Sequence, residues 1–344
     1  MKRSLIITIL TLIMAVPLVQ ADECGDYCTI SFELEVQTNE PNVTPLIPDT
    51  DLMYDRTYFR VDGRVQVYDA PGGNPTRIIE PGFNYVTILS RQEGWVQING
   101  NEWVQSEFTA DTTNVVSAHT GVLLSEEGLE YPMAWVLVNM YPSPAPGADP
   151  SEQFEFLPRY SRVNIYEVVE LDGEEWYMVG AGQWVHQFHV AKLRPLTEIP
   201  ESIDTDIWVS INLYEQVVVA YNGSTPIFAT LSSTGLPRWP TYEGTFHIYY
   251  RNPREYMSWG VVGDDYYSLE EVPWTMFFDE GRALHGAYWH DGLGYRRSHG
   301  CVNLSITDAR WMFDWVAAYM GTARSADIEQ GPAVYVYSSG EYSQ

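Results

Sequence analysis

One cysteine is better suited to covalent chemistry than any other residue of the chain. Cys301 ends the run Ser-His-Gly-Cys at 298–301, and His285 precedes it by sixteen positions. The thiolate is the nucleophilic form of cysteine, and a nearby imidazole or hydrogen-bond donors favour it. Because the remaining two cysteines lie close to the N-terminus, we interpret Cys301 as an unpaired, reactive thiol.

The residues that follow Cys301 predict a helix whose N-terminus lies near the thiol. Ser305 can cap this helix, and Gly321 is suited to its end. The apolar side chains at helical spacing, expected to face the core, are Ala309, Met312, Phe313, Val316 and Met320. The helix dipole favours a thiolate nearby, and Gly300 lets the backbone approach closely, so the amides of Gly300 and Cys301 are expected to face an oxyanion.

Two other interpretations of these residues stay open at this point. In one, Cys301 ligates zinc together with His285, His290 and His299, although their spacing follows no standard pattern. In the other, Cys301 is a small buried apolar residue and the histidines are ordinary surface residues. We expect His290 to be exposed and to have no catalytic role.

Short strands are the elements expected to position this site. Residues 207–213 alternate apolar and polar side chains, which is typical of a half-buried strand. A run at 216–221 reaches Asn222-Gly223, a strong hairpin signal, and the chain returns through 227–231. Further strands are expected at 245–250, 274–278, 283–284 and 333–337.

Two repeated modules are predicted upstream of these strands. Trp95 and Trp103 are eight positions apart, as are Trp176 and Trp184, and a tyrosine followed by proline precedes each pair. Short alternating runs bounded by Gly, Pro and Asn indicate small antiparallel barrels, which resemble bacterial SH3-like domains. We expect the tryptophans to pack in the module cores, with a ligand groove as the alternative.

The N-terminus predicts export. Lys2 and Arg3 precede an apolar run that ends in Val-Gln-Ala at 19–21, a cleavage pattern, so 1–21 is expected to be a signal peptide. A retained anchor is the alternative, although the run is shorter than a membrane-spanning helix. In an oxidising compartment, Cys24 and Cys28 are expected to form a local disulfide.

The charge of the chain argues against nucleic acid as a partner. The formal net charge is -27, and it becomes -29 when the two charges of Lys2 and Arg3 are removed. Affinity for nucleic acid depends on lysine and arginine side chains that release counterions from phosphates. The acidity is instead typical of a protein kept soluble outside the cell.

The residues around Cys301 resemble the signature of the L,D-transpeptidase catalytic domain (YkuD). The resemblance covers about 205–338 and includes the interval between His285 and Cys301. The stretches that carry it are His285-Gly286, Gly294, Ser-His-Gly-Cys-Val-Asn-Leu at 298–304, Ser-Thr-Gly at 233–235, Pro-Thr-Tyr-Glu-Gly-Thr-Phe at 240–246 and Pro-Trp-Thr-Met at 273–276.

The resemblance implies a cysteine enzyme that acts on the stem peptides of peptidoglycan. Cys301 would attack the carbonyl of the third residue, release D-alanine and form a thioester, which an amine from a neighbouring stem resolves as a 3,3 cross-link. His285 would be the general base, oriented by a backbone carbonyl near Gly286. The other implied residues are Ser298, His299, Gly300 and Asn303 around the oxyanion, and Trp274, Tyr288 and Gly294 in the substrate pocket. Acyl transfer of this kind needs no metal or organic cofactor.

Two departures from the family pattern concern substrate choice. Asn303 stands where many members have arginine, and Tyr242 stands where proline is common. With water as acceptor, the same nucleophile would give an L,D-carboxypeptidase. A non-catalytic wall-binding protein is a further alternative, against which the intact His285 and Cys301 argue.

The expected fold is therefore mainly β, with two SH3-like barrels before a sandwich that has one main helix after Cys301. The modules are expected to contact glycan or peptide strands, in the periplasm, the cell wall or the extracellular space. The expected segments are a signal peptide at 1–21, a linker at 22–51, modules at 52–112 and 113–195, a linker at 196–206 and a catalytic domain at 207–338.

Overall fold

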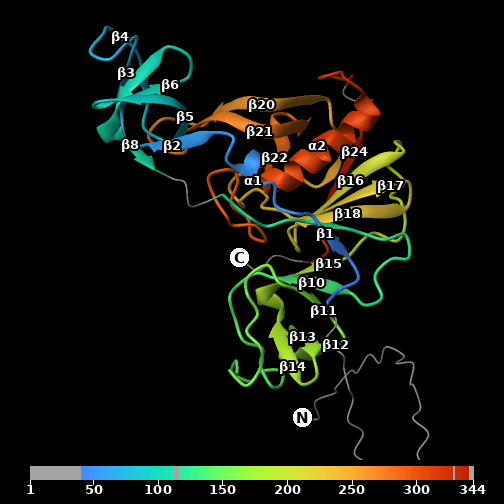
Figure 1. The fold of residues 1–344 in the computed structure, drawn as a ribbon. Coiled ribbons are helices and arrows are strands. Elements are labelled where there is room, and N and C mark those ends of the chain that lie inside the picture. The colour runs from blue at the N-terminus through green and yellow to red at the C-terminus, as the bar shows by residue number, and fades with distance from the viewer. Residues whose placement is uncertain (1–39, 112–115, 328–329, 341–344) are drawn as a thin grey trace, which may run out of the picture. The chain divides into compact units, whose positions relative to one another are not determined.

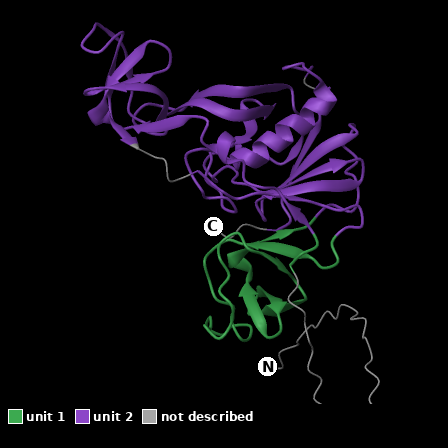
Figure 2. Ribbon diagram, in the orientation of Figure 1, with its two compact units in different colours: residues 1–42, 129–194 green, residues 43–128, 195–344 purple. Residues whose placement is uncertain are grey.

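The computed structural model describes residues 40–111, 116–327 and 330–340. They form two compact units, unit 1 from the described parts of 1–42 and 129–194, and unit 2 from those of 43–128 and 195–344 (Figure 2). The expected signal peptide and the disulfide between Cys24 and Cys28 lie outside the described residues, so both stay predictions.

The C-terminal part of unit 2 is a sandwich of two sheets, which we call the sandwich (residues 205–337; Figure 1). The strands of the first sheet, in spatial order, are β1 (Thr44–Pro45), β9 (Val122–Leu123), β18 (Thr225–Leu231), β17 (Val217–Asn222), β16 (Ile207–Asn212), β24 (Ala333–Tyr337) and β19 (Gly244–His247). All neighbours are antiparallel except β16 and β24. The predicted hairpin joins β17 and β18, and its Gly223 has the positive φ, 56°, that such a turn requires.

The second sheet runs from the sandwich into a small β module, which we call the first module (residues 57–111). Its main path is β23 (Val302–Leu304), β22 (Arg282–Gly286), β21 (Tyr267–Asp279), β5 (Phe83–Gln92), β6 (Trp95–Ile98), β7 (Glu102–Gln105), β3 (Val65–Tyr68) and β4 (Pro75–Ile79). Three further strands pair beside this path: β2 (Thr57–Val61), β8 (Thr109–Asp111) and β20 (Tyr250–Trp259). Short helical turns are α1 (Thr50–Met53) and η1 (Ser106–Phe108).

The predicted helix is α2 (Ile306–Met320), which packs on β21 and β22. The Asp308 N–H donates to the Ser305 side chain at 3.1 Å, as the capping pattern predicted. Of its expected inward face, every residue is buried except Met320, which is partly exposed. The helix and both sheets share one apolar core that includes Val209, Ile211, Met276, Leu284, Met312, Val316 and Val336. The mainly β fold with one main helix after Cys301 is thus confirmed.

Strand β16 differs from the half-buried strand that was predicted, because both of its faces are buried. Trp208 stacks on Tyr221 with ring centroids 3.9 Å apart, and the Asn212 amide donates to Ser339 at 2.9 Å. The polar residues of the alternating pattern therefore have partners inside the protein rather than water.

Two segments outside the predicted sandwich belong to its first sheet. β1, from the expected linker 22–51, pairs with β9, which lies within the expected second module at 113–195 and in turn pairs with β18. Buried Asp308 on α2 accepts the Gly121 N–H at 2.8 Å, which fixes the same segment to the helix. The compact units therefore divide near residue 129 and not at 113, and backbone pairing holds 121–124 on the sandwich sheet.

The first module has an apolar core of its own. Its buried residues come from several strands and are Phe59, Val61, Val65, Val67, Ile79, Val86, Val96, Ile98 and Val104. Trp103 is buried, whereas Trp95 is half-buried and meets Tyr68 edge-to-face at 5.0 Å.

Unit 1 is a second small β structure. Its strands are β10 (Met133–Val136), β11 (Arg162–Asn164) and β15 (Val190–Leu193) in one sheet, and β12 (Glu167–Leu171), β13 (Glu174–Gly180) and β14 (Gln183–His186) in another, with a turn η2 (Gln187–His189). Trp184 is buried and Trp176 is half-buried, so one tryptophan of each repeated pair packs in a core and the other is partly accessible.

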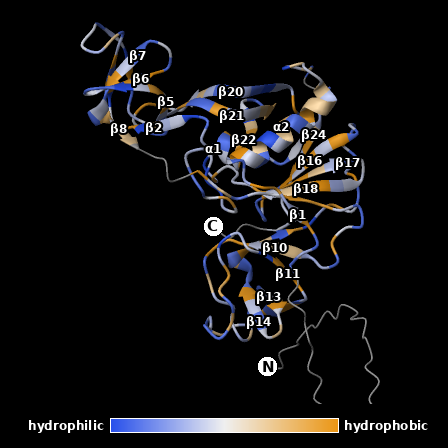
Figure 3. Ribbon diagram, viewed as in Figure 1, coloured by the Kyte–Doolittle hydropathy of each residue, from blue (hydrophilic) through white to orange (hydrophobic). Residues whose placement is uncertain are grey.

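Hydropathy follows the strands of both units. Figure 3 shows hydrophobic residues alternating with hydrophilic ones along the strands, as expected where one face of a strand is buried. Among the described residues, none of the helices has the length and apolar character that a membrane crossing needs.

Candidate active site

The pairing of two short parallel strands brings together the residues that the sequence singled out. β22 and β23 place Leu284 opposite Val302 and His285 opposite Asn303. Register partners on neighbouring strands project to the same face about 4.8 Å apart. Cys301 stands just before β23 and two positions from Asn303, so the alternation of a strand puts Cys301 and His285 on one face.

Cys301 is a half-buried thiol in its neutral form. Its Sγ lies 4.0 Å from the Gly281 carbonyl oxygen, a long S–H···O contact. Burial raises the pKa of the thiol to about 11, although the Ala283 N–H and the charge of Arg282 act in the opposite direction. At neutral pH the group is therefore a thiol and not a thiolate.

His285 is buried, with 2% of its surface exposed. Its Nδ1 lies 3.1 Å from the Gly286 carbonyl oxygen, and since a carbonyl only accepts, Nδ1 carries the proton. Nε2 is then the basic atom. Burial lowers the pKa of His285 to about 4, so the imidazole is neutral and can take up a proton.

Gly286 is placed where a side chain has no room. A Cβ there would lie 3.1 Å from both Ile306 Cα and Pro273 Cγ. The close approach lets β22 pack directly on the first turn of α2. Gly286 therefore has a packing role in addition to the hydrogen bond that its carbonyl accepts from His285.

The loop before Cys301 is held by its own hydrogen bonds. The Ser298 hydroxyl donates to the Cys301 carbonyl and accepts the Gly300 N–H at 3.0 Å. The Gly300 amide, which was expected to face an oxyanion, is thus already engaged by Ser298. Gly300 has φ of 111°, and a Cβ there would lie 2.8 Å from Arg282 Nε, so only glycine fits.

His299 belongs to an aromatic cluster beside Cys301. Its ring stacks on Trp239 at 3.9 Å and meets Tyr267 at 5.2 Å and Trp259 at 6.2 Å. Its Nε2 is buried and has no hydrogen-bond partner among the described residues. His299 is therefore a packed wall of the site, and the geometry favours His285 as the base.

His290 differs from the exposed residue that was expected. It is half-buried, and its Nε2 lies 2.8 Å from the side-chain amide of Asn303. The Gly292 N–H donates to the other ring nitrogen, Nδ1, at 3.0 Å. Asn303 is itself 2% exposed, and the opposite end of its amide has no partner among the described residues.

Of the three residues expected in the substrate pocket, Trp274 and Tyr288 have their side chains in a core. Trp274 is buried against Phe313 of α2, with ring centroids 5.4 Å apart. Tyr288 is fully buried and stacks on Tyr58 of the first module at 3.5 Å. Gly294 donates its N–H to the Ser232 carbonyl and so contributes backbone structure. The two aromatic side chains are buried because α2 covers Trp274 and the ring of Tyr58 covers Tyr288.

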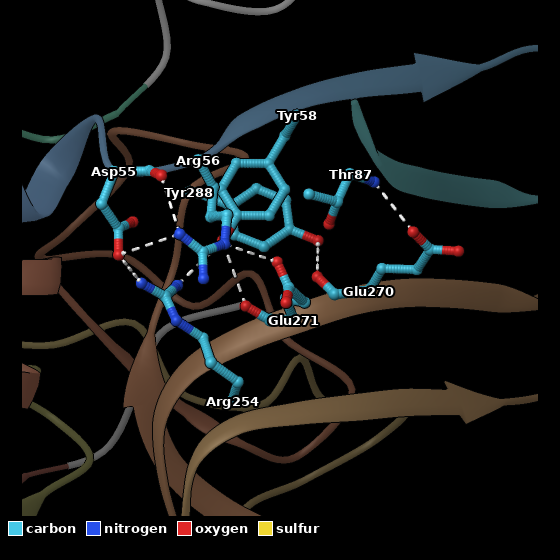
Figure 4. Close-up of polar contacts among 8 residues, drawn as sticks. All are labelled: Asp55, Arg56, Tyr58, Thr87, Arg254, Glu270, Glu271 and Tyr288. Carbon is cyan, nitrogen blue, oxygen red and sulfur yellow. Dashed lines mark hydrogen bonds and ion pairs between the residues drawn. The ribbon is translucent and has the colours of Figure 1, made fainter. Parts of the chain in front are cut away.

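The Tyr288 contact is part of a polar cluster between the first module and the sandwich. Tyr288 donates to the Glu270 carbonyl at 2.8 Å, and the Glu270 carboxylate accepts the Thr87 N–H at 2.8 Å (Figure 4). Arg254 donates to Tyr58 and pairs with Asp55 in the same view. A cavity of about 370 Å³ adjoins this cluster, and neither Cys301 nor His285 lines it.

Thr241 and Arg282 are site residues whose roles the sequence did not reveal. The Thr241 hydroxyl accepts the Gly235 N–H and donates to the Gly300 carbonyl, each at 2.9 Å. Arg282 donates to the Pro240 carbonyl at 3.1 Å and brings positive charge near the thiol. The Pro-Thr pair at 240–241 marked the threonine, whereas no sequence signal marked Arg282.

The described residues contain no group of three or more His, Cys, Asp or Glu side chains placed to hold a metal ion. The histidines of the zinc interpretation are engaged separately: His285 with Gly286, His290 with Asn303 and His299 with Trp239.

The sandwich matches a known protein family. Residues 205–336 match the family model of the L,D-transpeptidase catalytic domain, YkuD. The chain is 27% identical over 132 residues to the putative L,D-transpeptidase YciB of Bacillus subtilis, which covers 34% of this chain and 64% of that protein. It is 31% identical over 162 residues to L,D-transpeptidase 1 of Mycobacterium tuberculosis, covering 41% of this chain and 62% of that protein. The chain thus spans less than two thirds of either relative.

Solved structures of L,D-transpeptidases are also similar. The L,D-transpeptidase from Mycobacterium smegmatis is 18% identical and is matched over 65% of this chain and 93% of its own, with a TM-score of 0.33. The catalytic domain of the Enterococcus faecium L,D-transpeptidase is 21% identical over 40% of this chain and all of its own, with a TM-score of 0.32.

Proposed function

We propose that this chain is an exported peptidoglycan L,D-transpeptidase. It uses Cys301 to form a thioester with a stem tetrapeptide and transfers the acyl group to an amine of a second stem, which gives a 3,3 cross-link. The observation that carries the proposal is the pairing of His285 on β22 with Asn303 on β23, two positions after Cys301, inside a segment that matches the L,D-transpeptidase catalytic domain.

The acylation step follows from the charge states of the pair. The thiol proton passes to Nε2 of His285, whose Nδ1–H stays bonded to the Gly286 carbonyl. Sγ forms a bond to the carbonyl carbon of the third stem residue, whose oxygen becomes an oxyanion. When this intermediate collapses, the bond to the terminal D-alanine breaks, and its amine leaves with the proton from His285.

The second step regenerates the enzyme. An amine of another stem attacks the thioester carbonyl and gives up a proton through His285, and Cys301 leaves as the thiol. If water takes the place of the amine, the product is a free tripeptide. Both outcomes use the same residues, so the acceptor is decided by what reaches the thioester.

The upstream modules fit the same function. We propose that the first module and unit 1 are SH3-like wall-binding modules that keep the sandwich near its substrate, and that residues 1–21 direct export. The half-buried Trp95 and Trp176 are the tryptophans available for such contacts. The site of action is then the periplasm, the cell wall or the extracellular space.

The experiment is intact-protein mass spectrometry of residues 22–344 incubated with a disaccharide-tetrapeptide. We expect an adduct with the mass of the substrate minus D-alanine, and its absence in Cys301→Ala and in His285→Gln. The ratio of cross-linked dimer to free tripeptide then separates transfer from hydrolysis. Absence of both adduct and released D-alanine, with a reduced thiol and several stem-peptide variants, would disprove the enzyme and favour a binding protein.

A further inference from the structure

A histidine outside the expected catalytic set holds the amide of Asn303. We propose that His290 is a positioning residue, which orients this amide so that its NH2 group faces the space beside His285 and Cys301 and donates to the substrate oxygen that becomes negative during acylation. The inference rests on the proposed function, because it assigns a role to Asn303 in the same reaction.

The donor and acceptor atoms of the ring decide the orientation of the amide. A neutral imidazole has one N–H and one acceptor nitrogen. Because Nδ1 of His290 accepts the Gly292 N–H, Nε2 carries the proton and donates. With Asn303 Nδ2 opposite Nε2, two donors would face each other across 2.8 Å. An end-for-end rotation of the amide puts Oδ1 there and leaves the NH2 group at the unpartnered end.

Register and strand alternation put the Asn303 side chain on the same face as His285 and Cys301. Asn303 is the register partner of His285, and strand alternation places Cys301, two positions earlier, on the same face. The backbone of Asn303 is also fixed at the edge of β23 away from β22. There its N–H and its carbonyl pair with the Ser233 backbone at 3.0 and 2.9 Å. The amide therefore has little freedom beyond the orientation that His290 sets.

A buried donor without a partner lowers the stability of the resting protein. The same donor stabilises a transition state in which negative charge develops next to it. The Gly300 amide is engaged by Ser298, so the loop before Cys301 offers one donor fewer than the sequence suggested. The Asn303 NH2 group supplies a donor on this face. It is a neutral donor, unlike the guanidinium of an arginine, and so favours an oxygen with transient charge over a permanent carboxylate.

The tautomer of His290 can be measured without any substrate. Long-range ¹H–¹⁵N spectra of the chain from residue 22, labelled with ¹⁵N-histidine, report which ring nitrogen carries the proton, and His290→Gln assigns the signal. We expect the proton on Nε2 and a bare, hydrogen-bonded Nδ1. A proton on Nδ1 would overturn the proposal.

The kinetic test follows thioester formation by intact-protein mass spectrometry. Asn303→Asp replaces the donor with oxygen at nearly constant shape, and we expect acylation to slow about 100-fold. His290→Phe removes the hydrogen bonds of the ring to Gly292 and Asn303, and we expect a loss of about tenfold, because the amide then samples both orientations. His290→Gln keeps a side chain that can donate to Oδ1 and should recover most of that loss. The maximal rate should change more than the half-saturating substrate concentration.

Two outcomes of the kinetic test would contradict the proposal. If His290→Phe acylates at the wild-type rate, the histidine positions nothing. If His290→Phe and His290→Gln are equally slow and share a lower unfolding temperature, the ring only supports the structure.

Alkylation of Cys301 by iodoacetamide separates these failures from failure of the proposed function. If the wild-type thiol is alkylated but no stem peptide forms an adduct, the enzyme proposal fails. The tautomer of His290 then still decides whether the Asn303 amide has the proposed orientation.

Discussion

At the scale of single residues, burial sets the charge states of Cys301 and His285. Desolvation raises the pKa of Cys301 to about 11 and lowers that of His285 to about 4. Between these values both groups are neutral, so the resting site is a thiol beside an imidazole and not a thiolate–imidazolium pair. The thiol must therefore lose its proton during the reaction, because the thiolate is the nucleophilic form.

This charge state predicts the reactivity of Cys301 toward iodoacetamide. The rate of alkylation should rise about tenfold per pH unit between pH 7 and pH 9, because only the thiolate reacts and its fraction grows at that rate well below the pKa. Mass spectrometry of the peptide that carries Cys301 separates it from Cys24 and Cys28. A rate that is already constant below pH 7 would show an ion pair instead.

Gly300 gives a second prediction at this scale. Its φ is 111°, which strains any other residue, and an added Cβ would lie 2.8 Å from Arg282 Nε, so the arginine would also have to shift. Gly300→Ala should therefore destabilise the fold by about 1–3 kcal/mol and slow acylation. Gly321→Ala is the matched control, since Gly321 also has positive φ but has open space around it at the end of α2. Thermal unfolding and adduct formation measure both effects.

We expect both glycine variants to lose stability and only Gly300→Ala to lose acylation. Equal acylation by the two variants would show that the loop conformation does not matter for the reaction.

At the scale of elements, hydrogen bonds from distant segments hold the loop that carries Cys301. Thr241 is buried and links the Gly235 amide to the Gly300 carbonyl, while the Ser233 backbone pairs with Asn303. The segments at 233–235 and 240–241 thus clamp residues 300–303 from one side. On the other side β22 pairs with β23.

Replacement of the Thr241 hydroxyl should loosen this clamp. Thr241→Val keeps the shape but leaves a buried N–H and a buried carbonyl without a partner, which costs about 1–3 kcal/mol. We expect a lower midpoint in urea unfolding and slower thioester formation. Thr241→Ser keeps the hydroxyl and should retain most of both. If valine is as stable and as fast as threonine, the hydroxyl does not support the loop.

At the scale of the whole molecule, the first module and the sandwich are joined by a continuous sheet and a buried polar cluster. Strand β5 pairs in parallel with β21, and the rings of Tyr58 and Tyr288 stack beside this junction (Figure 4). Tyr288 lies three positions after His285, so the junction borders the strand that carries His285. Burial raises the pKa of Glu270, within this cluster, to about 7.

The junction is therefore expected to depend on pH. A carboxyl whose pKa is raised on folding stabilises the folded state fully below its ordinary pKa of 4.5, and this contribution is lost as the pH rises through about 7. The full effect is on the order of 3 kcal/mol. Wild type should lose stability between pH 5 and pH 8, whereas Glu270→Gln should lose less.

The difference in stability between wild type and Glu270→Gln reports the titration of Glu270 alone. Asp308, whose pKa burial raises to about 6, titrates in both and cancels in the difference. Thermal unfolding at several pH values measures the difference. Parallel curves for wild type and Glu270→Gln would contradict the raised pKa.

The sequence by itself determined the features that depend on neighbours along the chain. The helix after Ser305, the turn at Asn222-Gly223 and the mainly β character follow from capping, turn and alternation signals that act within a few residues. The choice of Cys301 and His285 also came from residue types and spacing, and the family match at 205–336 supports the same region. The structure pairs His285 with Asn303, two positions after Cys301, and the roles of Cys301 and His285 stay predictions.

The tertiary structure decided everything that depends on contacts between distant segments. It paired His285 with Asn303, joined 121–124 to the sandwich sheet, turned Trp274 and Tyr288 into core residues and brought His290 to the Asn303 amide. A local pattern specifies which residues alternate or cap, but it does not specify the strand that lies alongside. Register and burial arise only when the sheets close over one core, and they set the charges and the hydrogen bonds of the site.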